Sequence, residues 1–145
     1  MADPIRVLFV CTHNSARSQI AEALLRHDGG QDFEVHSAGT EATRVRPEAI
    51  AVLAEAGIDW SSAESKTIDR FLGQRFDYVI TVCDRARASC PVFPGGSETL
   101  HWGLDDPVEV EGTEAERQAA FDRVLVEVGR RINAFVPIAL SRPPA

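Results

Sequence analysis

The segment IRVLFVCTHNSARSQIAEALLRH, residues 5–27, predicts a strand, a tight loop and a helix in direct succession. Residues 5–10 form a nearly continuous β-branched and aromatic run, which is typical of a strand buried on both faces of a parallel sheet. From Ser18 onward, apolar residues recur at helical spacing, and this pattern ends before Gly29 and Gly30. The order of strand, loop and helix indicates the first unit of an α/β fold.

The remainder of the chain continues the alternation of strands and helices. One helix is predicted to open at Pro47, and another after Thr113, which forms a capping-box pattern with Glu116. The fold class is therefore α/β, a single-domain three-layer sandwich with a four-stranded parallel sheet flanked by helices. The domain is expected to span residues 1–145, with a flexible tail at 137–145. Further strands are predicted at residues 33–37, 77–82 and 98–102.

The composition limits the possible classes of function. The chain has 145 residues, of which 44% are hydrophobic and 26% charged, as in an ordinary globular protein. Its net charge of -7 argues against general binding to nucleic acid or to anionic membranes. The start of the chain lacks the layout of a secretory signal. Three cysteines do not fit a secreted domain held by paired disulfides, so we expect a cytoplasmic protein.

The loop CTHNSARS, residues 11–18, places a cysteine at the end of the first strand and an arginine at the start of a helix. Backbone amides gathered at a helix N-terminus bind a tetrahedral oxyanion, and the planar guanidinium of Arg17 can add a bidentate clamp. The same positive field favours the thiolate of Cys11, to which Ser18 can donate a hydrogen bond. The alternative for Cys11 is a small buried residue without chemistry. The predicted oxyanion-binding residues are Thr12, His13, Asn14, Ser15, Ala16 and Arg17.

Further reactive side chains follow the third and fourth predicted strands. Cys83 comes directly after the third strand, and Asp105 and Asp106 come shortly after the fourth. Because ligands of parallel α/β sheets bind outside the carboxyl ends of the strands, these side chains are expected near Cys11. The segment 83–96 contains several proline and glycine residues and is predicted to be irregular, although a helix over residues 83–90 stays open.

Several segments of this chain resemble one family. The resemblance is to the low-molecular-weight protein tyrosine phosphatases and to the arsenate reductases related to them. The spacing C-x5-R-S alone does not separate the two groups, but the wording CTHNSARSQ is more similar to the reductases. The resemblance therefore implies a phosphatase-like fold and covers most of the chain. The segments that carry it are VLFVCTHNSARSQIAEALLR (7–26), HSAGT (36–40), TVCDRARASCP (81–91) and HWGLDDP (101–107).

The second and third cysteines favour reduction over hydrolysis. Phosphate ester hydrolysis needs only Cys11, whereas arsenate is a phosphate analogue whose arsenic can accept two electrons. Attack by Cys83 on the arsenic-bound Cys11 would release arsenite and leave a Cys11–Cys83 disulfide, which Cys90 could convert to Cys83–Cys90. In the reductases that the chain resembles at all three cysteines, thioredoxin then restores the thiols. A low-molecular-weight thiol remains an alternative reductant. No tightly bound cofactor is expected, and phosphate or sulfate would act as substrate analogues.

The reaction also needs a proton donor for the oxygen that leaves arsenic. Asp106 precedes Pro107, which biases its backbone toward an extended conformation that could place its carboxyl group over the anion loop. The resemblance assigns the general acid to the aspartate before proline, hence Asp106 and not Asp105. An ordinary turn at this Asp-Pro pair is the alternative.

One lysine is placed where related reductases have an acidic residue. Some of them bind potassium beside the anion loop with residues that match Asn14, Glu22 and Ser37. Lys66, the only lysine of the chain, takes the acidic position, and its ammonium could replace the ion and pair with Glu22. We therefore expect no metal and hypothesise potassium independence. A solvated loop lysine is the alternative.

Two other functions fit part of the pattern. A low-molecular-weight protein tyrosine phosphatase could use Cys11, Arg17 and Asp106, but it would leave Cys83 and Cys90 unexplained. The sequence after the acid, DPVEVEG, also lacks an aromatic residue to hold a phosphotyrosine ring. A non-catalytic oxyanion or redox sensor would not need Asp106. We therefore favour arsenate reduction in arsenic detoxification, with weak hydrolysis of aryl phosphates as a side activity.

Overall fold

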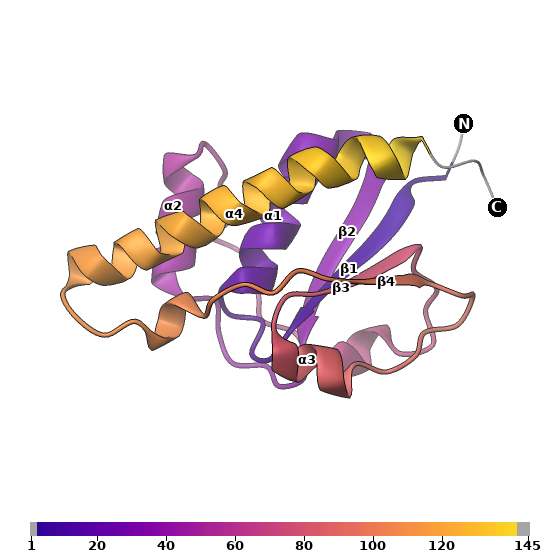
Figure 1. The fold of residues 1–145 in the computed structure, drawn as a ribbon, viewed down its shortest axis with the longest axis horizontal. Helices are drawn as coiled ribbons and strands as arrows, with labels where there is room; N and C mark the ends of the chain where they lie inside the picture. The colour runs from indigo at the N-terminus through magenta and orange to yellow at the C-terminus, as the bar shows by residue number, and fades with distance from the viewer. Residues whose placement is uncertain (1–2, 142–145) are drawn as a thin grey trace.

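The computed structural model of the chain, which describes residues 3–141, contains one parallel four-stranded sheet (Figure 1). The strand order is β2-β1-β3-β4, so the first strand lies in the interior of the sheet. This confirms the predicted α/β fold class with flanking helices. The strands are β1 (Ile5–Cys11), β2 (Phe33–Gly39), β3 (Tyr78–Thr81) and β4 (Glu98–His101).

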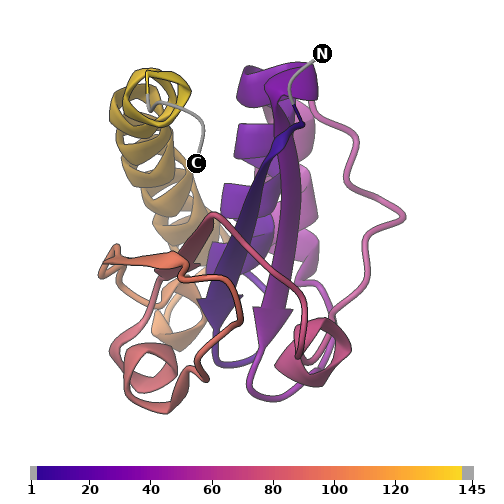
Figure 2. The same ribbon diagram turned by 90° about the vertical axis from the view of Figure 1, so that its right-hand side faces the viewer.

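Helices pack against the sheet, and one short helix lies near the carboxyl ends of its strands. In Figures 1 and 2 the long helix α4 (Glu114–Leu140) and helix α1 (Arg17–Gly29) lie together on one side of the sheet, with α2 (Pro47–Glu55) beside them. The short helix α3 (Asp84–Ser89) lies by the carboxyl ends of the strands, where the loop after β1 also turns. Three short 3-10 segments complete the chain: η1 (Gly30–Asp32), η2 (Ile68–Phe71) and η3 (Pro107–Glu109).

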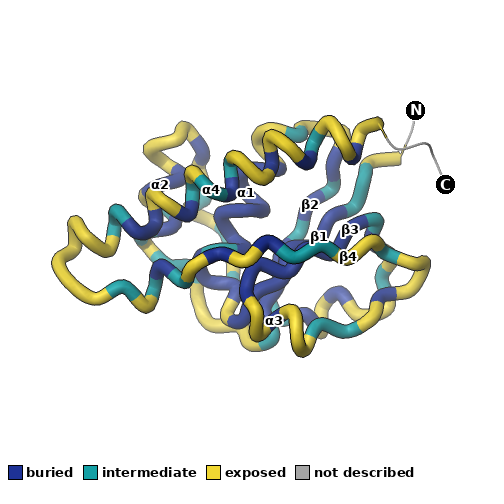
Figure 3. The backbone as a smooth tube through the Cα atoms, in the orientation of Figure 1, coloured by how far each residue is buried: buried dark blue, intermediate teal, exposed yellow. Residues whose placement is uncertain are grey.

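Strand β1 is the centre of the core because both of its edges are paired. It runs parallel to β2 from Ile5 opposite Phe33 to Cys11 opposite Gly39, and it pairs with β3 on its other side. Its residues 7–10 are fully buried, as expected for an apolar strand with both faces covered (Figure 3). The pairing on both edges holds β1 in place, with Cys11 as its last residue.

Helix α4 begins as predicted and ends later than predicted. Thr113 and Glu116 form the reciprocal capping box expected from the sequence. Residues 137–140, which were expected to belong to a flexible tail, continue the helix, while residues 142–145 lie outside the described part of the chain. The last turns stay helical because Phe135 and Ala139 are buried against the core.

The segment after β3 also differs from the prediction. Residues 83–96 were expected to be irregular, but residues 84–89 form helix α3, which Cys83 caps by accepting a hydrogen bond from the backbone N–H of Ala86. Between α3 and β4, residues 90–97 are without helix or strand, so the turn-forming prolines and glycines lie after the helix. None of the helices within residues 3–141 is long and apolar enough to cross a membrane.

Candidate active site

The thiol of Cys11 lies at the carboxyl end of β1, enclosed by the loop that leads into α1. Cys11 is almost fully buried, and its Sγ lies 2.8 Å from the Ser18 hydroxyl. The backbone N–H of Asn14 donates a hydrogen bond to the same sulfur over 3.1 Å. The sulfur thus has one backbone N–H donor and one hydroxyl group within hydrogen-bond distance.

Asn14 holds this loop in shape from its centre. Its backbone has a φ of 51°, a left-handed conformation that asparagine tolerates better than most residues. The side-chain amide donates to the hydroxyls of Ser18 (2.8 Å) and Ser37 (2.9 Å). Its oxygen accepts from the Gln19 amide and from the backbone N–H of Lys66, each over 2.9 Å. The fully buried Asn14 therefore joins the loop to α1, to β2 and to the segment before η2.

Gly39 allows β2 to end directly against this loop. A Cβ atom at Gly39 would lie only 2.6 Å from the carbonyl oxygen of Thr12 and 2.8 Å from the backbone nitrogen of Asn14. Neither neighbour is a flexible side chain that could yield. A larger residue at position 39 would therefore displace the anion loop itself.

Arg17 and Asp106 come together beside the loop. Arg17 is the first residue of α1, and its guanidinium donates to the carbonyl oxygen of Leu104 over 3.1 Å. The same guanidinium lies 3.5 Å from the Asp106 carboxylate, which also accepts from the backbone N–H of Val108 and so caps η3. Asp105 is exposed. Both aspartates line a cleft of about 660 Å³ between the 103–110 segment and α4.

Cys83 is linked to the anion loop through Thr12. The Thr12 hydroxyl lies 3.3 Å from the Cys83 Sγ, and both side chains are buried. Thr12 was expected only to help bind the oxyanion through its backbone. The contact joins residues 71 positions apart, so no local sequence signal could have indicated it. It places the Cys83 thiol beside the loop that begins at Cys11.

Cys90 is not brought together with the other two cysteines. It ends α3, is partly buried, and its thiol points to the carbonyl oxygen of Pro91 over 3.6 Å. The six helical residues between Cys83 and Cys90 separate their Cα atoms by about 10 Å, whereas a disulfide needs less than about 7 Å. Burial raises the pKa of the Cys90 thiol. All three cysteines are free thiols.

A buried carboxylate on α1 is neutralised by two cations. Glu22 is almost fully buried and accepts a hydrogen bond from the Ser37 hydroxyl over 2.6 Å. The Lys66 ammonium lies 3.6 Å from it, and Arg26, one turn further along α1, lies 2.8 Å from its other oxygen. Arg26 was missed in the sequence, although its spacing of four residues from Glu22 indicates such a pair. Within residues 3–141 no group of three or more His, Cys, Asp or Glu side chains is placed to hold a metal ion.

The remaining loop residues differ in exposure. His13 is exposed, and its imidazole lies 3.4 Å from the Glu41 carboxylate at the surface. Ser15 and Ala16 are buried. The loop therefore has His13 as its one exposed side chain between Cys11 and Arg17.

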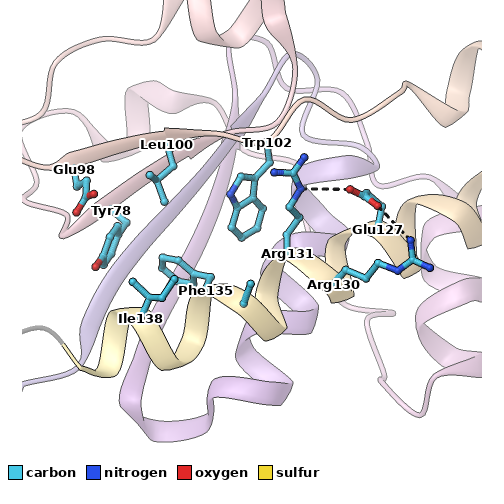
Figure 4. Close-up of a pocket in the computed structure, with 10 residues that line it drawn as sticks. Tyr78, Glu98, Leu100, Trp102, Glu127, Arg130, Arg131, Phe135 and Ile138 are labelled. Carbon is cyan, nitrogen blue, oxygen red and sulfur yellow. Dashed lines mark hydrogen bonds and ion pairs between the residues drawn. The ribbon is translucent and has the colours of Figure 1, made fainter.

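A second cleft lies away from these residues. It has a volume of about 570 Å³ and opens between strands β3 and β4 and helix α4 (Figure 4). Its floor is apolar, formed by the aromatic rings of Tyr78, Trp102 and Phe135, and Glu127 pairs with Arg131 at its rim. It contains none of the predicted site residues. The chemistry of the cysteines is therefore separate from this cleft.

Comparison with known proteins assigns the sequence to a family. The family described as low molecular weight phosphotyrosine protein phosphatase matches residues 6–142. An arsenate reductase of Halalkalibacterium halodurans is 46% identical over 129 residues, which are 89% of this chain and 93% of that protein. A thioredoxin-dependent arsenate reductase of Corynebacterium glutamicum has a solved structure with a TM-score of 0.71 and 35% identity, covering 98% of this chain and 66% of that one.

The fold alone does not separate reductase from phosphatase. The tyrosine phosphatase AmsI of Erwinia amylovora has a TM-score of 0.73, covering 98% of this chain and 95% of that one, but only 20% identity. At that level the similarity concerns the fold. The higher identity to the reductases therefore carries the functional distinction, together with the cysteines.

Proposed function

Because the chain belongs to the low molecular weight phosphotyrosine protein phosphatase family, and within it to the arsenate reductases, we propose that its three cysteines transfer electrons in sequence to bound arsenate. The protein is an arsenate-reducing enzyme that serves arsenic detoxification. The observation that carries the proposed order is the placement of Cys83 beside the Cys11 loop, with Thr12 between them. A hydrolytic enzyme would need no second buried thiol at this place.

The first step joins Cys11 to arsenic. Arsenate lies in the loop of residues 12–17, where Arg17 and the backbone amides neutralise its charge. The Cys11 thiolate attacks arsenic, an S–As bond forms, and one arsenate oxygen leaves as water. Asp106, 3.5 Å from the Arg17 guanidinium, supplies the proton for this leaving oxygen. Ser18 stabilises the thiolate before the attack through its 2.8 Å contact with the sulfur.

The second step reduces arsenic. The Cys83 thiolate attacks the Cys11 sulfur, so an S–S bond forms while the S–As bond breaks. The electron pair of the broken bond stays on arsenic, which passes from the +5 to the +3 state and leaves as arsenite. The two thiols lose two electrons together, which balances the two electrons gained by arsenic.

The third step moves the disulfide to the surface. The Cys90 thiolate attacks Cys83, and Cys11 leaves as a thiolate ready for the next arsenate. Because α3 holds Cys83 and Cys90 about 10 Å apart, the helix must unwind for the new bond to form. The Cys83–Cys90 disulfide is then reduced by thioredoxin, the reductant of the Corynebacterium relative. A cytoplasmic location fits this cycle, since thiols are kept reduced there.

Lys66 is proposed to occupy the place of a potassium ion. Its ammonium lies 3.6 Å from Glu22, and its backbone N–H donates to the Asn14 side chain. A bound monovalent cation would likewise supply one positive charge and a link to the anion loop. Because Arg26 pairs with the other oxygen of Glu22, the negative charge of this carboxylate is already neutralised.

The proposal is tested by turnover of arsenate with thioredoxin, thioredoxin reductase and NADPH. The wild type should oxidise NADPH continuously, whereas Cys90→Ser should complete one turnover and stop with a Cys11–Cys83 disulfide, detected by mass spectrometry after thiol alkylation. Ser89→Ala, an exposed change at the neighbouring position, should cycle like the wild type. Continuous turnover by Cys90→Ser with thioredoxin would contradict the cascade.

A further inference from the structure

A histidine joins the end of β4 to the start of α3. The imidazole of His101 lies 2.9 Å from the Asp84 carboxylate through Nε2, and 2.7 Å from the Thr81 hydroxyl through Nδ1. The Thr81 side chain is fully buried, and that of His101 is 19% exposed, while that of Asp84 is 95% exposed. A mostly buried imidazole thus fixes a carboxylate that otherwise projects into solvent.

The buried Thr81 hydroxyl faces two acceptors, Nδ1 of His101 at 2.7 Å and the Leu100 carbonyl oxygen at 3.4 Å. In the tautomer with its ring hydrogen on Nε2, His101 donates to the Asp84 carboxylate, and Nδ1 accepts from Thr81. Thr81 belongs to β3 and its backbone oxygen accepts from Trp102 over 2.8 Å, so the hydroxyl has little freedom to move. The contact with β3 therefore holds the His101 ring in place beside the start of α3.

This contact lies directly beside the second reactive thiol. The sheet hydrogen bonds end at Val82, which donates to Val10 and accepts from Leu104. Cys83 follows Val82 in the chain. The next residue, Asp84, is held by His101, a side chain from outside the helix. Cys83 is thus bracketed by the strand on one side and by the His101–Asp84 pair on the other.

The opposite end of α3 is held less firmly. Beyond Cys90, Val92 is 96% exposed, and Phe93 is the first buried side chain, packed against the Phe76 ring at 5.5 Å. Ala86 is the one buried side chain between Asp84 and Phe93, so residues 87–92 can rearrange without losing a buried anchor. The asymmetry favours movement of Cys90 toward a stationary Cys83.

We propose that His101, acting through Asp84, is a positioning residue that keeps Cys83 beside Cys11 while the Cys90 end of α3 unwinds. This inference rests on the proposed cascade. Because the anion loop makes no use of His101, loss of the pair should lower kcat and leave the KM for arsenate unchanged. A charge-assisted hydrogen bond lost in this way should reduce kcat about tenfold.

Two substitutions separate the two nitrogens of the ring. His101→Gln places an amide nitrogen near the position of Nε2 and can still donate to Asp84, whereas His101→Asn reaches only the Thr81 side. We expect kcat about tenfold lower in His101→Asn and in Asp84→Ala, and largely restored in His101→Gln. His27→Ala removes an exposed histidine paired with Asp28 on α1 and should change nothing.

Amide hydrogen exchange of the reduced protein tests the same inference without arsenate. The N–H of Arg87 donates to the Cys83 carbonyl oxygen over 3.1 Å, so its exchange reports whether the start of α3 is closed. Exchange should be about tenfold faster in His101→Asn and Asp84→Ala than in the wild type or His101→Gln. A failure of the wild type to reduce arsenate would overturn the cascade and leave this measurement intact.

The inference is overturned if His101→Asn and Asp84→Ala melt at a lower temperature but keep the wild-type kcat and the wild-type exchange of Arg87. That result would make the pair a purely structural contact. If His101→Asn does not fold, Asp84→Ala still allows the comparison with the wild type, because it alters an exposed side chain.

Discussion

The three thiols have different surroundings, and these differences support the order proposed for them. Cys11 has two hydrogen-bonding neighbours at its sulfur, the Ser18 hydroxyl and the Asn14 amide. Cys83 shares a buried contact with Thr12. The Cys90 thiol donates to the Pro91 carbonyl oxygen, its one hydrogen-bond partner among residues 3–141, and burial raises its pKa. A thiol with few donors and a raised pKa is a poor nucleophile until its surroundings change.

The pKa of Cys90 predicts the pH dependence of disulfide transfer. Only the thiolate attacks, and a raised pKa means that this form becomes populated at higher pH than for an unperturbed thiol. Conversion of Cys11–Cys83 to Cys83–Cys90 should therefore accelerate with rising pH up to the pKa of Cys90. Rapid alkylation and mass spectrometry across pH 6 to about 9.5 check this. A conversion rate that is flat over this range would contradict the prediction.

Lys66 predicts the response to monovalent cations. If its ammonium replaces potassium beside Glu22, turnover of the wild type should be equal in potassium and sodium at the same ionic strength. Lys66→Asp should bring a carboxylate to the acidic position and make turnover rise with potassium. Lys66→Met, which removes the charge without adding an oxygen ligand, should lose activity in both salts. A sharp potassium activation of the wild type would exclude the replacement.

At the scale of the element, α3 must be stable enough to keep Cys83 in place and weak enough to unwind. It has only six residues, and just one of them, Ala86, is buried. Short helices gain most of their stability from tertiary contacts, and α3 has few of these. Its stability should therefore set the rate of Cys83–Cys90 formation.

Weakening α3 should accelerate this step. Ala88 is an exposed residue of the helix, and Ala88→Gly lowers helix stability by about 1 kcal/mol, which corresponds to roughly a fivefold faster conversion. Ala51→Gly makes the same change at an exposed position of α2 and provides the control. Stopped-flow alkylation should show the acceleration in Ala88→Gly alone. Equal rates in the two variants would mean that unwinding does not limit the transfer.

At the scale of the whole molecule, the parallel sheet gathers residues distant in the chain at one edge. Cys11 ends β1, whereas Cys83 and Asp106 follow the ends of β3 and β4, and α1 and α4 pack against each other. The anion-binding site at this edge exists only in the folded protein. Binding is therefore coupled to global stability.

Phosphate should accordingly raise the melting temperature of the entire protein. At a phosphate concentration 100 times its Kd, stabilisation should be about 2.7 kcal/mol. Arg17→Lys keeps a positive charge but loses the planar fork, so its phosphate-induced shift should be smaller than that of the wild type. Differential scanning calorimetry against chloride at equal ionic strength measures both shifts. An undiminished shift in Arg17→Lys would place the anion away from this arginine.

The sequence by itself determined the fold class and the anion loop. The apolar run of β1, the helical spacing after Ser18 and the capping box at Thr113 are local patterns, and their physical causes act within a few residues. The position of Cys83 at a strand end followed from the same reasoning. The four-stranded parallel sheet was predictable because strands alternating with helices permit few topologies.

Only the tertiary structure decided which side chains meet. The contact of Thr12 with Cys83 and the His101–Asp84 pair depend on the register of β1, β3 and β4, which no local pattern specifies. Helix α3 was missed because the prolines and glycines that follow it dominate the local signal. The end of α4 was misplaced because burial of Ala139 outweighs Pro137 and the polar residues beyond it. In each case, contacts between distant residues contribute more free energy than local conformational preference.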